Sequence, residues 1–328
     1  MLSEAQVATY ERDGLLCPIR VMSDEEISGY RAEFDALAAE RGEAEAANKI
    51  FDEHFELPWI WEMATHPKIL DCVTALLGED VFLLATHFFC KYGPQEAFVA
   101  WHQDLRYWGL KPPTEVTAWL AIDDSTPDNG CMRCIPGIHR DRLLEHGKAE
   151  QAGNLLSINQ EVTVTEAEEQ LAVDCVLKAG EISLHDGMLI HGSLPNQSTQ
   201  RRCGLTIRFV PTHVRAGRRE WMNVGGRSWC GVRIGTGTSR IFRRRLGSGE
   251  FRDLLIQFED PVRVAAEDQG FLLRGGKGAM QLDVVDGAPV GAPRSAAIGH
   301  GGSPKEFFGT DLVAPLFERF LAVEEGTS

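Results

Sequence analysis

The sequence lacks the features that would assign it directly to a membrane or secreted class. No run of about 18 apolar residues occurs, so no transmembrane helix is expected. Residues 1–14 lean acidic and contain no continuous apolar stretch, so they do not have the pattern of a secretory signal. No internal repeat is visible. These absences predict a cytoplasmic globular protein, and 328 residues with 43% hydrophobic content suffice for one large core.

Positive charge is also scarce, because 33 Lys and Arg residues stand against 48 Asp and Glu, for a formal net charge of −15. A chain this acidic is not expected to bind nucleic acid. Residues 201–252 are the exception, with 13 Arg and two Glu. A block of like charge usually forms a solvated or interfacial surface. We therefore expect this Arg-rich segment at the surface or at a subunit contact, where a homodimer would use it.

The eight cysteines are scattered through the chain, and only Cys131 and Cys134 form a Cys-x-x-Cys pair. Without a secretory signal, reduced thiols are expected rather than disulfides. A zinc or redox site would need a second pair or a thioredoxin-like context, and neither occurs. The cysteines therefore do not indicate a function.

Helix signals are concentrated in the N-terminal part of the chain. Ser3 with Gln6 and Ser23 with Glu26 match the capping box, in which two side chains satisfy free amides of the first turn. Apolar residues recur at helical spacing after Ser23, and a third helix is predicted over residues 69–77. These helices are expected to pack against the rest of the fold through their apolar faces.

Beyond residue 80 the pattern changes to short apolar or alternating runs, separated by Gly, Pro, Asn and Asp. Examples are VFLLATHFFCKYG, EVTAWLAIDD, EISLHDG and CGLTIRFVP. Short strands without long helices between them indicate an antiparallel sandwich or barrel. We predict a mainly β fold with flanking helices (α+β), and specifically the cupin-like double-stranded β-helix, or jelly roll, made of two packed sheets.

Two regions are predicted along the chain. Residues 1–215 are expected to form the jelly-roll domain together with its N-terminal helices. Residues 216–328 are expected to form a Gly- and Arg-rich extension packed on the same domain, with loops over residues 223–239 and 287–303. Apolar residues at helical spacing within residues 311–325 predict a terminal helix.

The most informative motif is His102-Gln103-Asp104, followed 89 residues later by His191. Two imidazoles and one carboxylate on one face of a metal leave the opposite positions open, as in the facial triad of non-haem Fe(II) oxygenases. Residues i and i+2 of an extended segment face the same side, so His102 and Asp104 are expected to bind together. Gln103 would then face elsewhere or steady a neighbouring group. The alternative interpretation is a solvent-exposed His–Asp pair in a turn.

These residues resemble the phytanoyl-CoA dioxygenase family. Its members place His-x-Asp on one strand, a second His before Gly-Ser, and an Arg 11 residues further on, here Arg202. The NGCMRCIPGIH loop and Trp119 within VTAWLAI match as well, and the resemblance covers residues 1–215. It implies a hydroxylase that binds Fe(II) and uses 2-oxoglutarate and O2. Halogenating relatives lack the carboxylate of the triad, whereas Asp104 is present here.

The resemblance also implies a site for 2-oxoglutarate. Arg202 would bind the distal carboxylate through its planar, always-charged guanidinium. Ser193 resembles the family serine that assists this arginine, and Trp119 resembles a family tryptophan at the same co-substrate. Lys91, on the strand before the triad, would add positive charge there.

Several residues near the triad are candidates for binding a small-molecule substrate. Arg208 shares a strand face with Arg202, so it is expected to point the same way, toward either a protein carboxylate or an anionic substrate. His185 is expected either in the pocket, or near the ligands, or as a satisfied core residue. Aromatic rings near the triad would either bind a quaternary ammonium group or pack in the core. The candidate substrate residues are Trp101, Gln103, Tyr107, Trp108, Arg133, His185 and Arg208.

Three short stretches, WHQD…YWGL, NGCMR and SLH-x-G, resemble the branch of the family that hydroxylates small aminoalkyl phosphonates. In that chemistry an ammonium group would face Trp or Tyr, and a phosphonate would face Arg133 or Arg208. Two other functions remain open. One is a jelly-roll enzyme that uses the same ligands for a redox-neutral reaction and does not require Arg202. The other is a non-catalytic protein that binds a small molecule or assembles through the Arg-rich segment.

Overall fold

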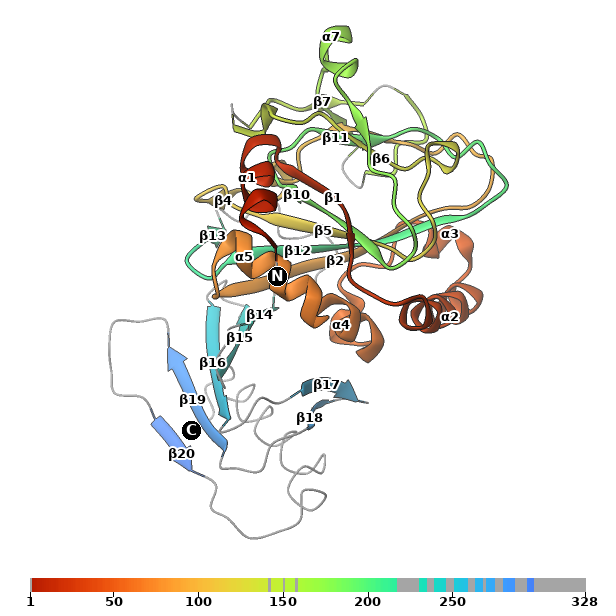
Figure 1. Cartoon of the computed structure of the whole chain (residues 1–328). Helices are drawn as coiled ribbons and strands as arrows, with labels where there is room; N and C mark the ends of the chain where they lie inside the picture. Colours follow the sequence, from red (N-terminus) through yellow and green to blue (C-terminus); the bar gives the residue numbers. More distant parts are fainter. Residues whose placement is uncertain are drawn as a thin grey trace. The chain divides into compact units, whose positions relative to one another are not determined.

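The computed structural model of the chain (Figure 1) describes residues 2–140, 143–149, 151–156, 159–216, 230–234, 239–245, 251–258, 263–267, 270–274, 280–286 and 294–297. The chain divides into two compact units. Unit 1 comprises Met1–Asp52, His66–Gly78 and Ala85–Val224, and unit 2 comprises the remaining residues. Within the described ranges, no helix combines the length and the apolar character that crossing a membrane requires. The seven cysteines for which a side chain is described are free.

The helices of unit 1 begin where the capping signals predict. Helix α1 spans Glu4–Asp13 and α2 spans Asp24–Arg41, and both start with a complete capping box. Helix α5, over Pro67–Leu77, begins two residues earlier than predicted because Pro67 occupies the first helical turn, a favoured place for proline. The short helix α3 covers Glu43–Ala46. The three helix predictions are confirmed.

Two antiparallel sheets form the body of unit 1. The first has the order β1-β10-β5-β12-β2. The second is smaller and has the order β3-β11-β6-β9. The larger sheet comprises β1 (Leu15–Arg20), β10 (Glu181–Asp186), β5 (Val116–Ala121), β12 (Arg202–Pro211) and β2 (Val81–Lys91). The smaller comprises β3 (Val99–His102), β11 (His191–Ser193), β6 (Met132–Cys134) and β9 (Val173–Asp174). This arrangement confirms the predicted jelly roll.

Strands β5 and β12 are buried along their whole length, on both faces. One face of each strand contributes side chains to a cavity between the two sheets. Helix α5 lies against the same two strands (Figure 1). A strand covered on both sides is rich in apolar residues without alternation, which explains the continuous apolar run of VTAWLAI.

Short elements connect these strands. Helix α6 (Leu105–Trp108) follows β3 directly, and β4 (Leu110–Lys111) pairs with β13 (Arg215–Ala216). Strand β7 (Gly147–Lys148) pairs with β8 (Gln160–Glu161). The remaining short helices are η2 (Pro127–Asn129), η3 (Ile138–Arg140) and α7 (Glu166–Glu169).

Unit 2 contains η1 (Glu53–Phe55), α4 (Pro58–Ala64) and antiparallel strands from the C-terminal part of the chain. The strands run in the order β14-β15-β16-β19-β20, and β17 pairs with β18 as a hairpin. Their bounds are β14 (Cys230–Ile234), β15 (Ser239–Arg245), β16 (Phe251–Phe258), β17 (Arg263–Glu267), β18 (Gly270–Arg274), β19 (Met280–Asp286) and β20 (Arg294–Ala297).

Strands β14 and β20 lie inside segments that we expected to be loops from their glycine content. Strand formation depends on pairing with a neighbouring strand, which glycine count does not report. The predicted terminal helix within residues 311–325 lies outside the described residues, and so do the side chains of the Arg-rich segment beyond Val214.

Candidate functional site

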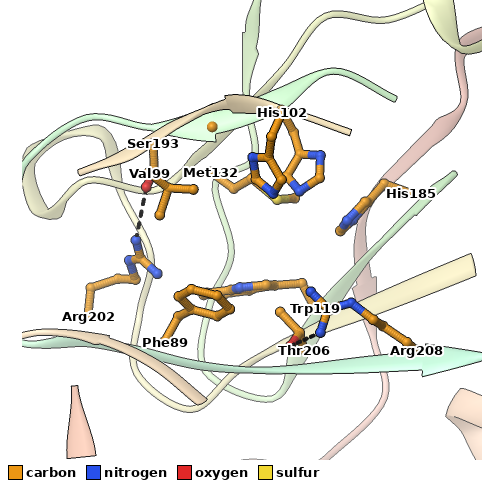
Figure 2. Close-up of a pocket in the computed structure, with 12 residues that line it drawn as sticks. Phe89, Val99, His102, Trp119, Met132, His185, Ser193, Arg202, Thr206 and Arg208 are labelled. Atoms are coloured by element: carbon orange, nitrogen blue, oxygen red, sulfur yellow. Dashed lines mark hydrogen bonds between the residues drawn. The ribbon is translucent and has the colours of Figure 1, made fainter. Parts of the chain in front are cut away.

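A cavity lies between the two sheets of unit 1 (Figure 2). The larger sheet contributes Phe89, Trp119, His185, Arg202, Thr206 and Arg208, and the smaller sheet contributes Val99, His102, Met132, His191, Gly192 and Ser193. A concave site with a few converging polar groups on an apolar wall is the usual form of a small-molecule site.

The three residues of the predicted triad meet at this cavity. Strand β3 ends at His102 and β11 begins at His191, and these two residues are paired directly in the antiparallel ladder. Their ring centroids are 4.1 Å apart, and Asp104 Oδ1 lies 3.6 Å from His102 Nε2. One ligand atom from each of the three side chains lies within 4.8 Å of the others. Cross-strand pairing thus brings together residues that are 89 positions apart.

Asp104 reaches the cavity by a different route from the one predicted. We expected His102 and Asp104 to share one face of an extended strand, but β3 ends at His102 and Asp104 has helical dihedral angles, φ −58° and ψ −40°. The chain turns into α6 at this point, so the turn, and not strand alternation, directs the carboxylate toward the imidazoles.

Gln103, between the two, faces away from the cavity and steadies neighbouring loops. Its Nε2 donates to Met188 O at 2.6 Å, and its Oε1 accepts from Leu144 N at 2.7 Å. Its backbone N–H donates to His146 Nε2 at 3.0 Å. Gln103 therefore connects the segment between the two ligands to two loops, one of which precedes His191.

The two imidazoles are oriented as metal-binding histidines usually are. His102 Nδ1 lies 2.9 Å from Ala100 O, and His191 Nδ1 lies 3.0 Å from Leu189 O. A backbone carbonyl can only accept a hydrogen bond, so the proton of each neutral imidazole lies on Nδ1. Nε2 then keeps a free lone pair that can bind a metal beside Asp104. Two neutral nitrogens and one carboxylate oxygen fit a divalent ion such as Fe(II).

The protonation states agree with metal binding. Burial, together with the neighbouring imidazoles of His102 and His185, holds the pKa of His191 well below its usual value. Burial alone would raise the pKa of Asp104, but the Arg208 guanidinium and the nearby imidazoles hold it well below its usual range. His191 is therefore neutral and Asp104 ionised at neutral pH, as metal ligands must be.

Arg208 and two residues that sequence reasoning missed hold the Asp104 carboxylate in place. Arg208 Nε donates to Asp104 Oδ2 at 3.3 Å, and its Nη2 donates to Oδ1 at 3.2 Å. Thr117 Oγ1 donates to Asp104 Oδ2 at 3.0 Å and also contacts Glu115. Burial and the charge of Asp104 raise the pKa of Glu115 to about 8. Of the two partners considered for Arg208, the structure contains the protein carboxylate.

A signal for these missed residues exists in the sequence. Glu115 and Thr117 are two positions apart in EVTAWLAI, so both project toward the same side as Trp119. Nothing in the sequence indicates that this side contacts Asp104, because the contact depends on how the two sheets pack.

The three polar residues predicted at the 2-oxoglutarate site converge at another end of the cavity. Arg202 Nε and Nη2 donate to Gly130 O at 3.1 and 2.9 Å, and Nη2 lies 3.4 Å from Ser193 Oγ. Lys91 Nζ donates to the same Ser193 Oγ at 2.8 Å and to Leu194 O. Figure 2 shows Arg202 pointing at Ser193 across the cavity from β12.

Both basic side chains at this end are buried, with 0% of Lys91 and 2% of Arg202 exposed. No ion pair joins either one to a carboxylate within the described part of the chain. Burial, and then the charge of Arg202, lower the pKa of Lys91 to about 5. The Arg202 guanidinium lies 5.4 Å from the centroid of the Trp119 ring. A buried guanidinium beside a buried amine, neither with a carboxylate partner, indicates a site for an anionic ligand.

Most of the predicted substrate residues are not brought to the cavity. Arg133 follows Met132 on β6, and strand alternation directs it to the opposite side from the cavity. Its guanidinium lies 5.6 Å from the Trp101 ring centroid and pairs with Glu169 and Asp174 at 3.3 and 3.4 Å. Trp101 is partly buried and packs against a separate core cluster.

The aromatic residues of α6 also have partners within the protein. The Arg208 guanidinium lies 5.8 Å from the centroid of the Trp108 ring. Tyr107 is edge-on to the His102 ring at 6.3 Å. Among the seven candidates, only His185 and Arg208 line the cavity.

Two antiparallel sheets with two imidazoles, a carboxylate and a buried anion site between them define a non-haem, metal-dependent oxygenase of the jelly-roll class. The chain belongs to the phytanoyl-CoA dioxygenase (PhyH) family, whose profile matches residues 10–204.

Relatives within this family have varied activities. Ectoine dioxygenase of Nocardia farcinica is 25% identical over 230 residues, covering 62% of this chain and 76% of the relative. A probable alpha-ketoglutarate-dependent hypophosphite dioxygenase of Stutzerimonas stutzeri is 30% identical over 168 residues, covering 49% of this chain and 56% of the relative. Peroxisomal phytanoyl-CoA dioxygenase of Bos taurus is 25% identical over 236 residues, covering 64% of this chain and 69% of the relative.

Solved structures agree with the family assignment. The non-heme monooxygenase ThoJ is 29% identical, with a TM-score of 0.55 over 64% of this chain and 79% of ThoJ. The epimerase SnoN, in complex with Fe3+, alpha-ketoglutarate and nogalamycin RO, is 21% identical with a TM-score of 0.56, over 68% of this chain and 90% of SnoN, and shares the fold. The chain is accordingly an Fe(II)- and 2-oxoglutarate-dependent dioxygenase.

Proposed function

We propose that this dioxygenase hydroxylates an unactivated C–H bond of a small polar substrate, with Fe(II) bound by His102, Asp104 and His191. The supporting observation is that these ligand atoms lie within 4.8 Å of one another, with both histidines orienting Nε2 toward the carboxylate. Bound iron supplies the O2 activation that converts 2-oxoglutarate, O2 and a C–H bond into succinate, CO2 and a C–OH group. The protein holds the ligands, orients both substrates and excludes water from the cavity.

Arg202 and Ser193 are proposed to bind the distal carboxylate of 2-oxoglutarate, with Lys91 adding a third donor. The flat Trp119 ring supports the Arg202 guanidinium from the neighbouring strand β5. Gly204 makes room for this ring, because a Cβ atom at that position would lie 2.1 Å from Trp119 Cζ2. Arg202 is thereby held in one orientation before the co-substrate arrives, which reduces the entropy lost on binding.

For the substrate itself, a small acid is favoured over a quaternary ammonium ion or an acyl-CoA. The rings of Trp101 and Trp108, proposed to face an ammonium group, already lie near the guanidinium groups of Arg133 and Arg208. The ectoine and hypophosphite dioxygenases are named for small polar substrates, whereas the bovine relative is named for an acyl-CoA. An aminoalkyl phosphonate remains the specific candidate.

The experiment has two parts. Fe(II) and 2-oxoglutarate are added to the protein under argon, and a weak visible charge-transfer band is expected, because it requires bidentate co-substrate on iron. Succinate release is then screened over aminoalkyl phosphonates, betaines, amino acids and acyl-CoA thioesters. A protein that forms no band has no functional iron and 2-oxoglutarate site of the proposed kind. Succinate release coupled only to an acyl-CoA would overturn the small polar substrate.

Lys91 leads to a prediction on the pH dependence of 2-oxoglutarate binding. Its pKa of about 5 leaves the amine neutral at pH 7, and a carboxylate bound beside it favours the ammonium form and raises that pKa. Binding should therefore take up a proton. The association constant for 2-oxoglutarate is expected to fall by about tenfold per pH unit above pH 5. The fall should end where the pH exceeds the raised pKa of Lys91 in the complex.

Calorimetry at pH 7 in two buffers of different ionisation enthalpy measures this proton uptake in the Fe(II)-loaded protein under argon. Close to one proton is expected for the wild type, and none for Lys91→Met. Equal binding enthalpies in the two buffers for the wild type would show that Lys91 does not change its protonation state.

A further inference from the structure

His185 is a buried histidine whose hydrogen-bonding capacity is unused. It lies on β10 with 1% of its surface exposed, and neither ring nitrogen has a hydrogen-bond partner in the part of the chain that the structure describes. Its Nε2 is 3.8 Å from Asp104 Oδ2, beyond hydrogen-bond distance. Figure 2 shows its ring pointing into the cavity. Because buried polar groups are costly to leave unpaired, two unpaired nitrogens that face a cavity make His185 a candidate to bind a ligand there.

The position of His185 separates it from the proposed 2-oxoglutarate end. In Figure 2, Arg202 and Ser193 lie on the left of the cavity, and His185 and Arg208 lie on the right, with His102 above and between them. The His185 ring centroid is 4.5 Å from that of His191. A group bound to His185 would therefore lie beside the proposed metal ligands and away from the carboxylate held by Arg202.

Two arginines, Arg202 and Arg208, line the cavity that His185 faces. The carboxylate beside His185 is that of Asp104, whose Oδ2 lies 3.8 Å from His185 Nε2. Arg208 pairs with Asp104 at 3.2 Å and with Glu115 at 3.7 Å. Asp104 is also a proposed metal ligand, so a bound metal would share its charge with Arg208 and leave the region around His185 more positive. Arg208 Nη1 is held by Thr206 Oγ1 at 2.9 Å, which keeps the guanidinium at the cavity wall.

We propose that His185, with Arg208 behind it, forms a subsite that binds an oxyanion of the substrate, either a carboxylate or a phosphonate. The imidazole of His185 can donate an N–H to such an oxygen. This inference rests on the proposed function, because it places the substrate in the cavity that holds iron and 2-oxoglutarate. Holding the acidic group at this end would bring the adjacent carbon atoms toward the metal ligands.

The test uses simple probes in place of the natural substrate. The Fe(II)- and 2-oxoglutarate-loaded protein is kept under argon with 2-oxoglutarate at saturation, and its visible band is followed during titration. Ethylphosphonate and propionate are the two oxyanion probes, and propionamide and choline are the uncharged and cationic comparisons. Both oxyanions are expected to shift the band saturably, and their relative affinities distinguish a phosphonate from a carboxylate subsite. Displacement of 2-oxoglutarate would abolish the band instead of shifting it.

Three variants locate the effect. His185→Phe keeps the ring volume without hydrogen-bonding atoms, and is expected to weaken oxyanion binding by about 10- to 100-fold, as loss of a hydrogen bond to a charged group does. His185→Gln retains an N–H donor and should stay within a few-fold of the wild type. Lys178→Gln removes an exposed cation on another part of the surface and should bind the probes unchanged. The affinity for 2-oxoglutarate is expected to stay the same in all three.

The outcomes separate this inference from the proposed function. Two results would overturn the subsite while the dioxygenase assignment stands, provided that the wild type forms the band. In one, propionamide shifts the band as strongly as propionate does. In the other, His185→Phe binds the two oxyanions as tightly as the wild type does. If the band never forms, the proposed function fails first.

Discussion

Replacing Asp104 with alanine is expected to reduce coupled succinate formation by about 1000-fold or more. The variant loses one of three proposed iron ligands, and a loss of about 4 kcal/mol in metal binding corresponds to about that factor in affinity. It also leaves Arg208, which is 8% exposed, without the carboxylate that accepts its two hydrogen bonds. Glu115, 3.7 Å from Arg208 Nε, is then the remaining carboxylate beside this guanidinium, so the loss of folding stability is expected to stay below about 3–5 kcal/mol, the typical cost of an uncompensated buried charge. Metal content by elemental analysis and succinate release by chromatography measure the first effect, and chemical denaturation measures the second.

A double variant separates the two effects. Asp104→Ala combined with Arg208→Met removes both buried charges, so most of the lost stability is expected to return. Activity should not return, because the carboxylate ligand is still missing. A stable double variant that remains inactive assigns the loss to metal binding. An Asp104→Ala protein that retains iron and turnover would rule out Asp104 as a ligand.

Replacing Arg202 with methionine is expected to raise KM for 2-oxoglutarate by about 100- to 1000-fold. The guanidinium is the proposed partner of the distal carboxylate, and truncating one member of a buried charge pair costs about 2–5 kcal/mol of binding. Folding stability should behave differently from that of Asp104→Ala, because no carboxylate of the described residues pairs with Arg202. Because this buried cation has no carboxylate partner, its removal is expected to leave the free energy of unfolding without co-substrate unchanged or to raise it.

The neighbouring arginine provides a matched control. Arg201 points out of the cavity and forms ion pairs with Asp35 and Asp123. Arg201→Met is expected to leave KM for 2-oxoglutarate unchanged and to reduce stability by about 1 kcal/mol. Steady-state succinate release at varied 2-oxoglutarate measures both variants. A wild-type KM in Arg202→Met would place the distal carboxylate elsewhere.

The helices and the metal triad were predictable because their signals are local or are fixed by order along the chain. A capping box needs only two side chains three residues apart, so Ser3 and Ser23 mark the starts of α1 and α2 whatever packs against them. The His-x-Asp motif, the later His191 and Arg202 form an ordered set that few chains contain by chance. Their residue types already specify nitrogen and oxygen ligands and a fixed cation.

Predictions failed where the direction of a side chain depends on where an element ends or on which of its faces is buried. Arg133 was predicted to bind an acidic substrate. Because side chains alternate along β6, Met132 lines the cavity and Arg133 points away from it. Asp104 was expected on a strand, but that strand ends two residues before it. For Arg133, a shift of one residue along the strand would reverse the side that the side chain faces. Asp104 reaches the predicted cavity, but the turn after β3 directs its carboxylate there instead of strand alternation.

The amino-acid sequence alone determined the jelly-roll class, the family and the set of candidate iron and 2-oxoglutarate residues. Only the tertiary structure decided that Arg208 pairs with Asp104, that Thr117 and Glu115 lie behind that carboxylate, and that His185 faces the cavity with both nitrogens unpaired. The physical reason is that local patterns specify secondary structure and chemical type, whereas these contacts join strands of two different sheets. Which side chains meet across a cavity depends on how the sheets pack, and sequence spacing does not report that packing.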